Sequence, residues 1–117
     1  MKFFFAGLAA AVMSTATGAF AAGYEPAHCS HANTGAVRAI CESYSLGQAD
    51  ARMATLFSVA TSLVGMGQRG ELIDTQREWL KKRNGCGSET ACLMNAYELR
   101  IQQLDAIIAS IASRGPY

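Results

Sequence analysis

The most chemically suggestive segment is His28-Cys29-Ser30-His31, which brings imidazole and thiol side chains close together. These side chains bind zinc, but a structural zinc site needs four ligands and usually takes its cysteines from pairs spaced two residues apart. The chain has four cysteines, and no two of them have that spacing. If Cys29 is in a disulfide, two histidines remain, so we expect no metal and no cofactor.

Catalysis by a side-chain nucleophile needs a base beside it and a third group that orients the base. The chain has no histidine besides His28 and His31, and we expect its cysteines to be disulfide-bonded. The glycine-rich segment 65–70 does not follow a predicted strand, so a phosphate-binding loop is not expected there. The sequence therefore favours a protein that is not an enzyme.

Asp50 is the carboxylate with an unusual position, because it falls within a stripe of apolar residues. Burying a lone charge is very costly, so Asp50 must be paired or hydrogen-bonded. Both Arg83 and Arg100 are candidate partners, and the sequence does not decide between them. We expect a structural ion pair rather than a catalytic carboxylate.

The four cysteines form an even set in a short chain, which is typical of disulfides. Three pairings are possible, and we favour the two local ones, Cys29–Cys41 and Cys86–Cys92. Each of these pairs brackets a turn beside a predicted helix end, where closure over a short loop is geometrically easy. On the chain-entropy argument, each bond stabilises the fold by roughly 2–3 kcal/mol.

The N-terminus predicts export. Lys2 precedes an uncharged apolar run over residues 3–13, and Ala19-Phe20-Ala21 is a small-residue cleavage motif, so residues 1–21 are predicted to be a signal peptide. The run is shorter than the roughly 20 apolar residues that span a bilayer, although an uncleaved anchor is the alternative. We expect a periplasmic or secreted protein that does not span the membrane.

Removing 21 of the 117 residues leaves a single domain of 96. Its nine lysines and arginines balance its nine acidic residues. Because nucleic-acid binding needs a surplus of cations, we expect no nucleic-acid partner.

The predicted fold class is all-α, a small disulfide-stabilised bundle of three longer helices plus one short N-terminal helix. Residues 22–33 are predicted to form an irregular arm, and residues 34–117 the helical domain. Thr34 is the expected N-cap of the short helix, which runs to about residue 42, and Ser45 that of the second helix. The apolar residues of the second helix recur at three- and four-residue steps up to Val64.

Gly65, Gly67 and Gly70 predict a flexible turn before the third helix, expected over 71–83. Ser88 is the expected N-cap of the fourth helix. The residues expected to face inward from the third helix are Leu72, Ile73, Gln76, Trp79 and Leu80, and those from the fourth are Leu93, Tyr97, Ile101, Leu104, Ile108 and Ile111.

One pattern is more specific than the rest. It combines Cys29, Ile40-Cys41, a Gln-x-x-Trp-Leu-x-x-Arg-x-x-Cys segment over 76–86, and a Cys-Leu-x-x-x-Tyr-x-x-Arg-Ile segment over 92–101. The pattern resembles that of the lysozyme inhibitor LprI-like N-terminal domain family of small exported bacterial proteins, over roughly residues 29–104. The chain departs from the family at Val37, Ala49 and Phe57, where Glu, Leu and Tyr are usual.

The resemblance implies an all-α fold and a protein partner, with a periplasmic lysozyme-type muramidase as the target. The alternative is an envelope interaction module, or an immunity-like one, that binds another cell-wall enzyme without catalysis. Residues that could contribute to binding are those at the basic end of the third helix, namely Trp79, Lys81, Lys82 and Arg83. A structural role for Trp79 and Tyr97, in the core beside Cys86–Cys92, is the competing interpretation.

Overall fold

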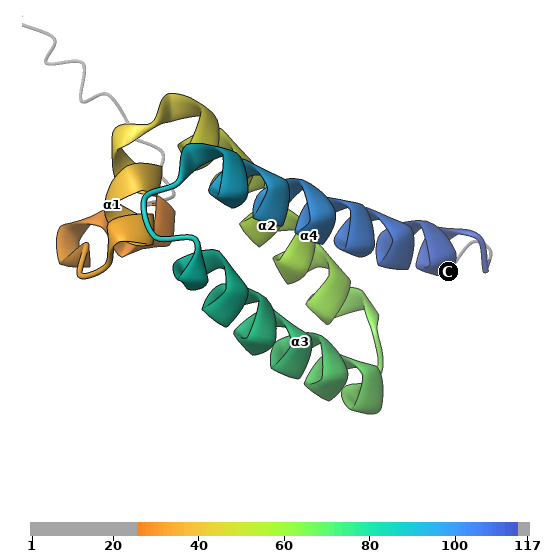
Figure 1. Ribbon diagram of the computed structural model, residues 1–117. Helices are drawn as coiled ribbons and strands as arrows, with labels where there is room; N and C mark the ends of the chain where they lie inside the picture. Colours follow the sequence, from red (N-terminus) through yellow and green to blue (C-terminus); the bar gives the residue numbers. More distant parts are fainter. Residues whose placement is uncertain (1–25, 115–117) are drawn as a thin grey trace, which may run out of the picture.

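The computed structural model describes residues 26–114. In chain order its elements are the short 3-10 helix η1 (Pro26–His31) and the α-helices α1 (Gly35–Glu42), α2 (Tyr44–Leu63), α3 (Met66–Gly85) and α4 (Thr90–Ala112) (Figure 1). These residues contain no strand, so the all-α prediction of three longer helices plus a short one is confirmed. The predicted signal peptide, residues 1–21, lies outside the described residues.

The helices α2 and α4 share the largest interface. Because short turns join α2 to α3 and α3 to α4, the chain reverses twice, and α2 and α4 run in the same direction (Figure 1). The helix α3 runs back between these turns, and Figure 1 shows it diverging from α4. The short elements η1 and α1 pack together and against α2. None of the helices in residues 26–114 combines the length and apolarity needed to cross a bilayer.

The N-terminal segment is more ordered than predicted. Residues 26–31, assigned from sequence to an irregular arm, form η1, and the disulfide Cys29–Cys41 ties it to α1. Thr34 caps α1 as predicted, since its hydroxyl accepts a hydrogen bond from the Val37 N–H at 3.1 Å. The predicted cap of α2 is wrong. Ser43 rather than Ser45 accepts the Leu46 N–H at 3.3 Å, because α2 begins immediately after α1 ends.

The predicted glycine turn over 65–70 is also wrong. Only Gly65 lies outside a helix, and α3 already begins at Met66, so it includes Gly67 and Gly70. Arg69 explains the early start, because its Nε donates to the Thr61 carbonyl at 2.8 Å and its Nη2 to the Val64 carbonyl at 3.4 Å. These bonds satisfy carbonyls at the end of α2 and hold the first turn of α3. Their stabilisation outweighs the cost of placing glycine within a helix, which is about 1 kcal/mol per residue.

The turn between α3 and α4 depends on Gly87, whose φ of 58° lies in the left-handed region that glycine adopts without steric cost. The second disulfide, Cys86–Cys92, closes this turn, and so both predicted pairings are confirmed. The predicted cap Ser88 is wrong by one residue, because Glu89 occupies the N-cap position and makes no side-chain capping bond.

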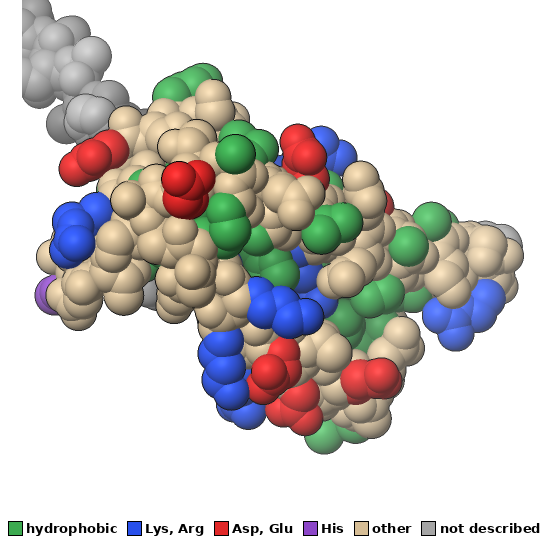
Figure 2. Space-filling view, viewed as in Figure 1, with side chains coloured by type: hydrophobic (Ala, Val, Ile, Leu, Met, Phe, Trp, Pro, Cys, Tyr) green, Lys and Arg blue, Asp and Glu red, His purple; other side chains and the backbone are tan. Residues whose placement is uncertain are grey.

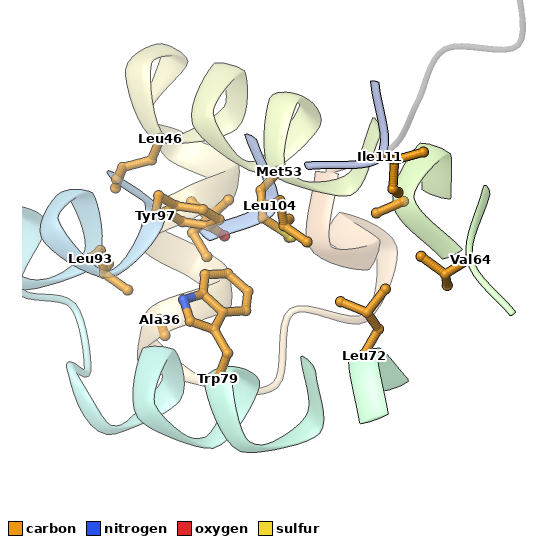
Figure 3. Close-up of a cluster of buried hydrophobic side chains, with 12 residues drawn as sticks. Ala36, Leu46, Met53, Val64, Leu72, Trp79, Leu93, Tyr97, Leu104 and Ile111 are labelled. Atoms are coloured by element: carbon orange, nitrogen blue, oxygen red, sulfur yellow. The ribbon is translucent and has the colours of Figure 1, made fainter. Parts of the chain in front are cut away.

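The buried apolar side chains form one core to which α1, α2, α3 and α4 all contribute (Figure 3). They are Ala36, Ile40, Leu46, Met53, Ala60, Val64, Leu72, Trp79, Leu93, Tyr97, Leu104 and Ile111. Figure 3 shows Trp79 pointing from α3 toward Tyr97, while Leu72 points toward Val64 and Ile111. Contrary to prediction, Ile73 is exposed, because it lies one residue further round α3 than Leu72.

Candidate functional site

Asp50 is buried on α2 and forms an ion pair with Arg83 of α3, as one of the two sequence-based alternatives predicted. The Arg83 Nη1 lies 3.7 Å from the Asp50 Oδ1, and the two side chains are 7% and 2% exposed. The Tyr97 hydroxyl on α4 donates a hydrogen bond to the same Asp50 oxygen at 2.7 Å and accepts one from the Arg83 Nη1 at 3.4 Å. The cluster therefore joins the three long helices through one carboxylate.

Further contacts hold the Arg83 and Tyr97 side chains of this cluster in place. The Arg83 guanidinium lies over the Trp79 ring, 5.7 Å from its centroid, and its Nε and Nη2 donate to the Asn84 side-chain oxygen at 3.2 and 3.0 Å. Burial raises the pKa of Tyr97 well above its ordinary value, and the hydrogen bond to Asp50 raises it further. A neutral phenol hydrogen-bonded to a paired carboxylate inside the core acts as a structural crosslink.

Arg100 does not contact Asp50, so the second sequence-based alternative is wrong. Its Nε donates to the Gln76 side-chain oxygen at 2.9 Å. Its Nη1 donates to the Gln103 side-chain oxygen at 3.2 Å, and its Nη2 to the Thr75 hydroxyl at 3.4 Å. The reason is position along α4: Tyr97 faces the end of α3 that carries Arg83, whereas Arg100 lies one turn further on, opposite Thr75 and Gln76.

Arg100 differs from Arg83 in its electrostatic environment. It is 3% exposed, and no carboxylate among residues 26–114 lies within ion-pair distance of it. Burial lowers the pKa of its guanidinium. Among residues 26–114, two arginines are thus buried, one paired with a carboxylate and one hydrogen-bonded to neutral groups.

A groove lies between α3 and α4, which we call the α3/α4 groove, and it has a volume of about 860 Å³. Its floor includes Trp79 and Arg100, and the Cys86–Cys92 disulfide lies at one end. Figure 2 shows hydrophobic side chains at the surface between α4 and α3. The other lining residues are Gln68, Glu71, Leu72, Thr75, Glu78, Lys82, Asn95, Ala96, Leu99, Gln103, Ala106 and Ile107.

The predicted binding residues separate into two faces of α3. Trp79 and Arg83 are buried, and the Trp79 indole N–H donates to the Ala96 carbonyl at 2.9 Å while its ring makes an edge contact with Tyr97 at 5.1 Å. Lys81 and Lys82 are exposed. Lys81 pairs with Glu78 at 3.1 Å, and Lys82 borders the groove. Residues four apart share a helix face, so Trp79 and Arg83 face the core together, while Lys81 and Lys82 remain exposed.

Sequence reasoning did not identify the α4 side of the groove. Leu99 is 52% exposed there, and Ala96, Ala106 and Ile107 line the same surface. The available signal was that Leu99 and Ile107 lie outside the predicted core stripe of α4, which makes this helix apolar on more than one face.

All four cysteines form disulfides, and the described residues contain no cluster of three or more His, Cys, Asp or Glu side chains that could hold a metal ion. Comparison with protein-family models, with curated proteins and with solved structures finds no match for this chain. The candidate site is therefore defined by its geometry, with the α3/α4 groove as its central feature.

Proposed function

We propose that this protein is an exported, non-catalytic binding module of the bacterial envelope, which uses the α3/α4 groove to bind a protein partner. The groove carries the proposal, because it leaves Leu99 and neighbouring apolar side chains open to solvent beside a buried core. Exposed apolar surface of this kind is typical of interaction sites. Two disulfides are compatible with an extracytoplasmic location.

The target we propose is a lysozyme-type muramidase, on the strength of the resemblance to the LprI-like pattern. The charges that line the groove are balanced, because Glu71 and Glu78 are accompanied by Lys82 and Arg100. Asp74 and Glu78 on α3 also form exposed ion pairs with Arg77 and Lys81. The proposal of this target therefore rests on the resemblance and on the groove rather than on net charge.

A muramidase turbidity assay tests this proposal. The oxidised protein should slow the clearing of a cell-wall suspension when it is in micromolar excess over the enzyme. Leu99→Asp should abolish that inhibition, because it places a charge in the groove. Leu63→Asp is the matched control, since Leu63 is also 52% exposed but does not line the groove. Failure of the wild-type protein to inhibit any lysozyme class would overturn the muramidase as target.

The second candidate is an immunity-like module that binds another cell-wall enzyme. Because Trp79 and Arg83 are buried, they cannot form a projecting group that enters a sugar cleft. The α3/α4 groove is concave and suits a partner that inserts a segment of its own, which favours this second candidate over an inhibitor that plugs a sugar cleft. Affinity capture from periplasmic extract would separate the two candidates. A specific cell-wall enzyme other than lysozyme should be retained by the wild-type protein and lost with Leu99→Asp.

A further inference from the structure

We propose that the α3/α4 groove receives an amphipathic helix of the partner, and that Arg100 forms an ion pair with an Asp or Glu on the apolar face of that helix. This inference rests on the proposed function and specifies the chemistry of the bound segment. It follows from the charge on the groove floor, the spacing of the lining residues and the charges on the rim.

The charge on the floor is the first observation. A guanidinium has five N–H donors, and the contacts of Arg100 with Gln76, Gln103 and Thr75 engage three of them, all with neutral acceptors. One N–H on each of the two Nη atoms remains. A buried charge is costly unless it is paired, and Arg83, which is similarly buried, is paired with Asp50. Arg100 borders the groove, where a carboxylate from a ligand can supply the missing counter-charge.

The spacing of the lining residues is the second observation. On α3 the groove is lined by Leu72, Thr75, Trp79 and Lys82, and on α4 by residues 96, 99, 103 and 106, which recur at three- and four-residue steps. These are the rows of side chains that pack between the side chains of another helix. They extend over about 15 Å of each helix, the length of about three turns. Small side chains at positions 75, 96 and 106 leave room for close approach.

The charges on the rim complete the description of the partner helix. Glu71 and Glu78 are exposed and lie two turns apart on α3, along one edge of the groove, and the exposed Lys82 follows Glu78 by one turn. We expect the flank of the bound helix that faces α3 to carry Lys or Arg at matching spacing. The partner helix is therefore basic on its flank, apolar where it enters the groove, and acidic at the one position opposite Arg100.

A fatty acid is the other ligand that combines an apolar body with a carboxylate. The groove is open to solvent, so an acyl chain bound in it would stay partly wet. An amphipathic helix, in contrast, keeps its polar face in solvent when its apolar face is bound. These two features favour the helix, and palmitate is included as a probe below.

The experiment uses three synthetic 18-residue peptides as probes. Each has Leu and Ala on one helical face and Lys on the flank, and they differ only in whether the central apolar-face residue is Glu, Gln or Lys. Binding to the oxidised protein is measured by calorimetry and by amide chemical shifts. The Glu peptide should bind at least ten-fold more tightly than the Gln peptide and shift the amides of Thr75, Leu99 and Ala106. The Lys peptide should bind most weakly.

The same titrations with protein variants identify the group responsible. Arg100→Gln should reduce the Glu-over-Gln preference to less than two-fold, whereas Arg52→Gln, which removes an exposed arginine on α2, should preserve it. Leu99→Asp keeps Arg100 in place and should abolish binding of all three peptides. Far-UV circular dichroism and thermal unfolding check that each variant is folded, and Leu99→Asp provides the second test if Arg100→Gln does not fold.

Three results would overturn the inference: equal binding of the Glu and Gln peptides, a preference that persists in Arg100→Gln, or no peptide binding in the millimolar range. Arg100-dependent binding of palmitate without peptide binding would assign the groove to an acyl ligand instead. Muramidase inhibition that is lost in Leu99→Asp while the peptides bind equally would leave the proposed function standing and refute the inference. Peptide discrimination without muramidase inhibition would support the inference and overturn the muramidase as target.

Discussion

Asp50→Asn changes the core by one charge and almost no volume. The asparagine oxygen can still accept the Tyr97 hydroxyl, which donates to Asp50 at 2.7 Å. Arg83, in contrast, loses the carboxylate that lies 3.7 Å from its Nη1. The main effect of the substitution is therefore to leave one buried cation without its counter-charge.

Breaking a buried ion pair by removing one partner costs about 3–5 kcal/mol. Arg83 keeps its hydrogen bonds to Asn84 and its contact with Trp79, so we expect the lower end, about 3 kcal/mol. That is a large fraction of the roughly 5–15 kcal/mol that stabilises a domain of this kind. The exposed pair Arg52–Asp105 is closer, at 3.3 Å, but its side chains are 65% and 47% exposed. Asp105→Asn should therefore cost less than about 1 kcal/mol.

Urea unfolding of the oxidised protein at pH 7, followed by far-UV circular dichroism, measures both changes. With a urea dependence of about 1–3 kcal/mol per M, Asp50→Asn should lower the midpoint by about 1–3 M, and Asp105→Asn should barely move it. Adding Arg83→Met to Asp50→Asn should recover part of the loss, because the unpaired cation is removed. Equal losses from Asp50→Asn and Asp105→Asn would refute the argument, since burial would then not set the strength of the pair.

The remaining predictions concern pH, backbone conformation and the disulfides. Burial holds the folded-state pKa of Tyr97 above the unfolded value of about 10. The contribution of Tyr97 to stability should therefore be constant below pH 10. Above pH 10 it should fall by up to about 1.4 kcal/mol per pH unit. The same alkaline titration of Tyr97→Phe should lack that component, and identical pH profiles would contradict it. Gly87→Ala should lower the free energy of unfolding by about 1–2 kcal/mol, because it forces a side chain into the left-handed region. Gly70→Ala, in open space on α3, should raise the free energy of unfolding by about 0.5–1 kcal/mol. If urea unfolding shows that both substitutions change this free energy in the same direction, the conformational argument is disproved. Replacing Cys86 and Cys92 by serine should cost about 2 kcal/mol on the loop-entropy argument, and thermal unfolding that is unchanged by the double substitution would refute it.

The features that the sequence determined by itself are local ones. The three- and four-residue apolar spacing of α2 and α4 specifies helices without reference to the rest of the chain. The Thr34 cap depends on an atom three residues away. The two disulfides close loops of 12 and 6 residues, so their pairing could be inferred from chain distance and turn position.

Tertiary structure decided the features that depend on where one helix meets another. Arg83 and Arg100 were equal candidates for Asp50 in the sequence, and only the way α3 passes α4 brings one to the carboxylate and leaves the other on the floor of the groove. Gly67 and Gly70 carry a turn signal, but Arg69 overrides it through carbonyls at the end of α2. The α3/α4 groove itself exists because α3 and α4 diverge from the turn that Cys86–Cys92 closes (Figure 1). Such contacts join residues far apart in the chain, and their energies depend on burial and orientation, which no local pattern of residues contains.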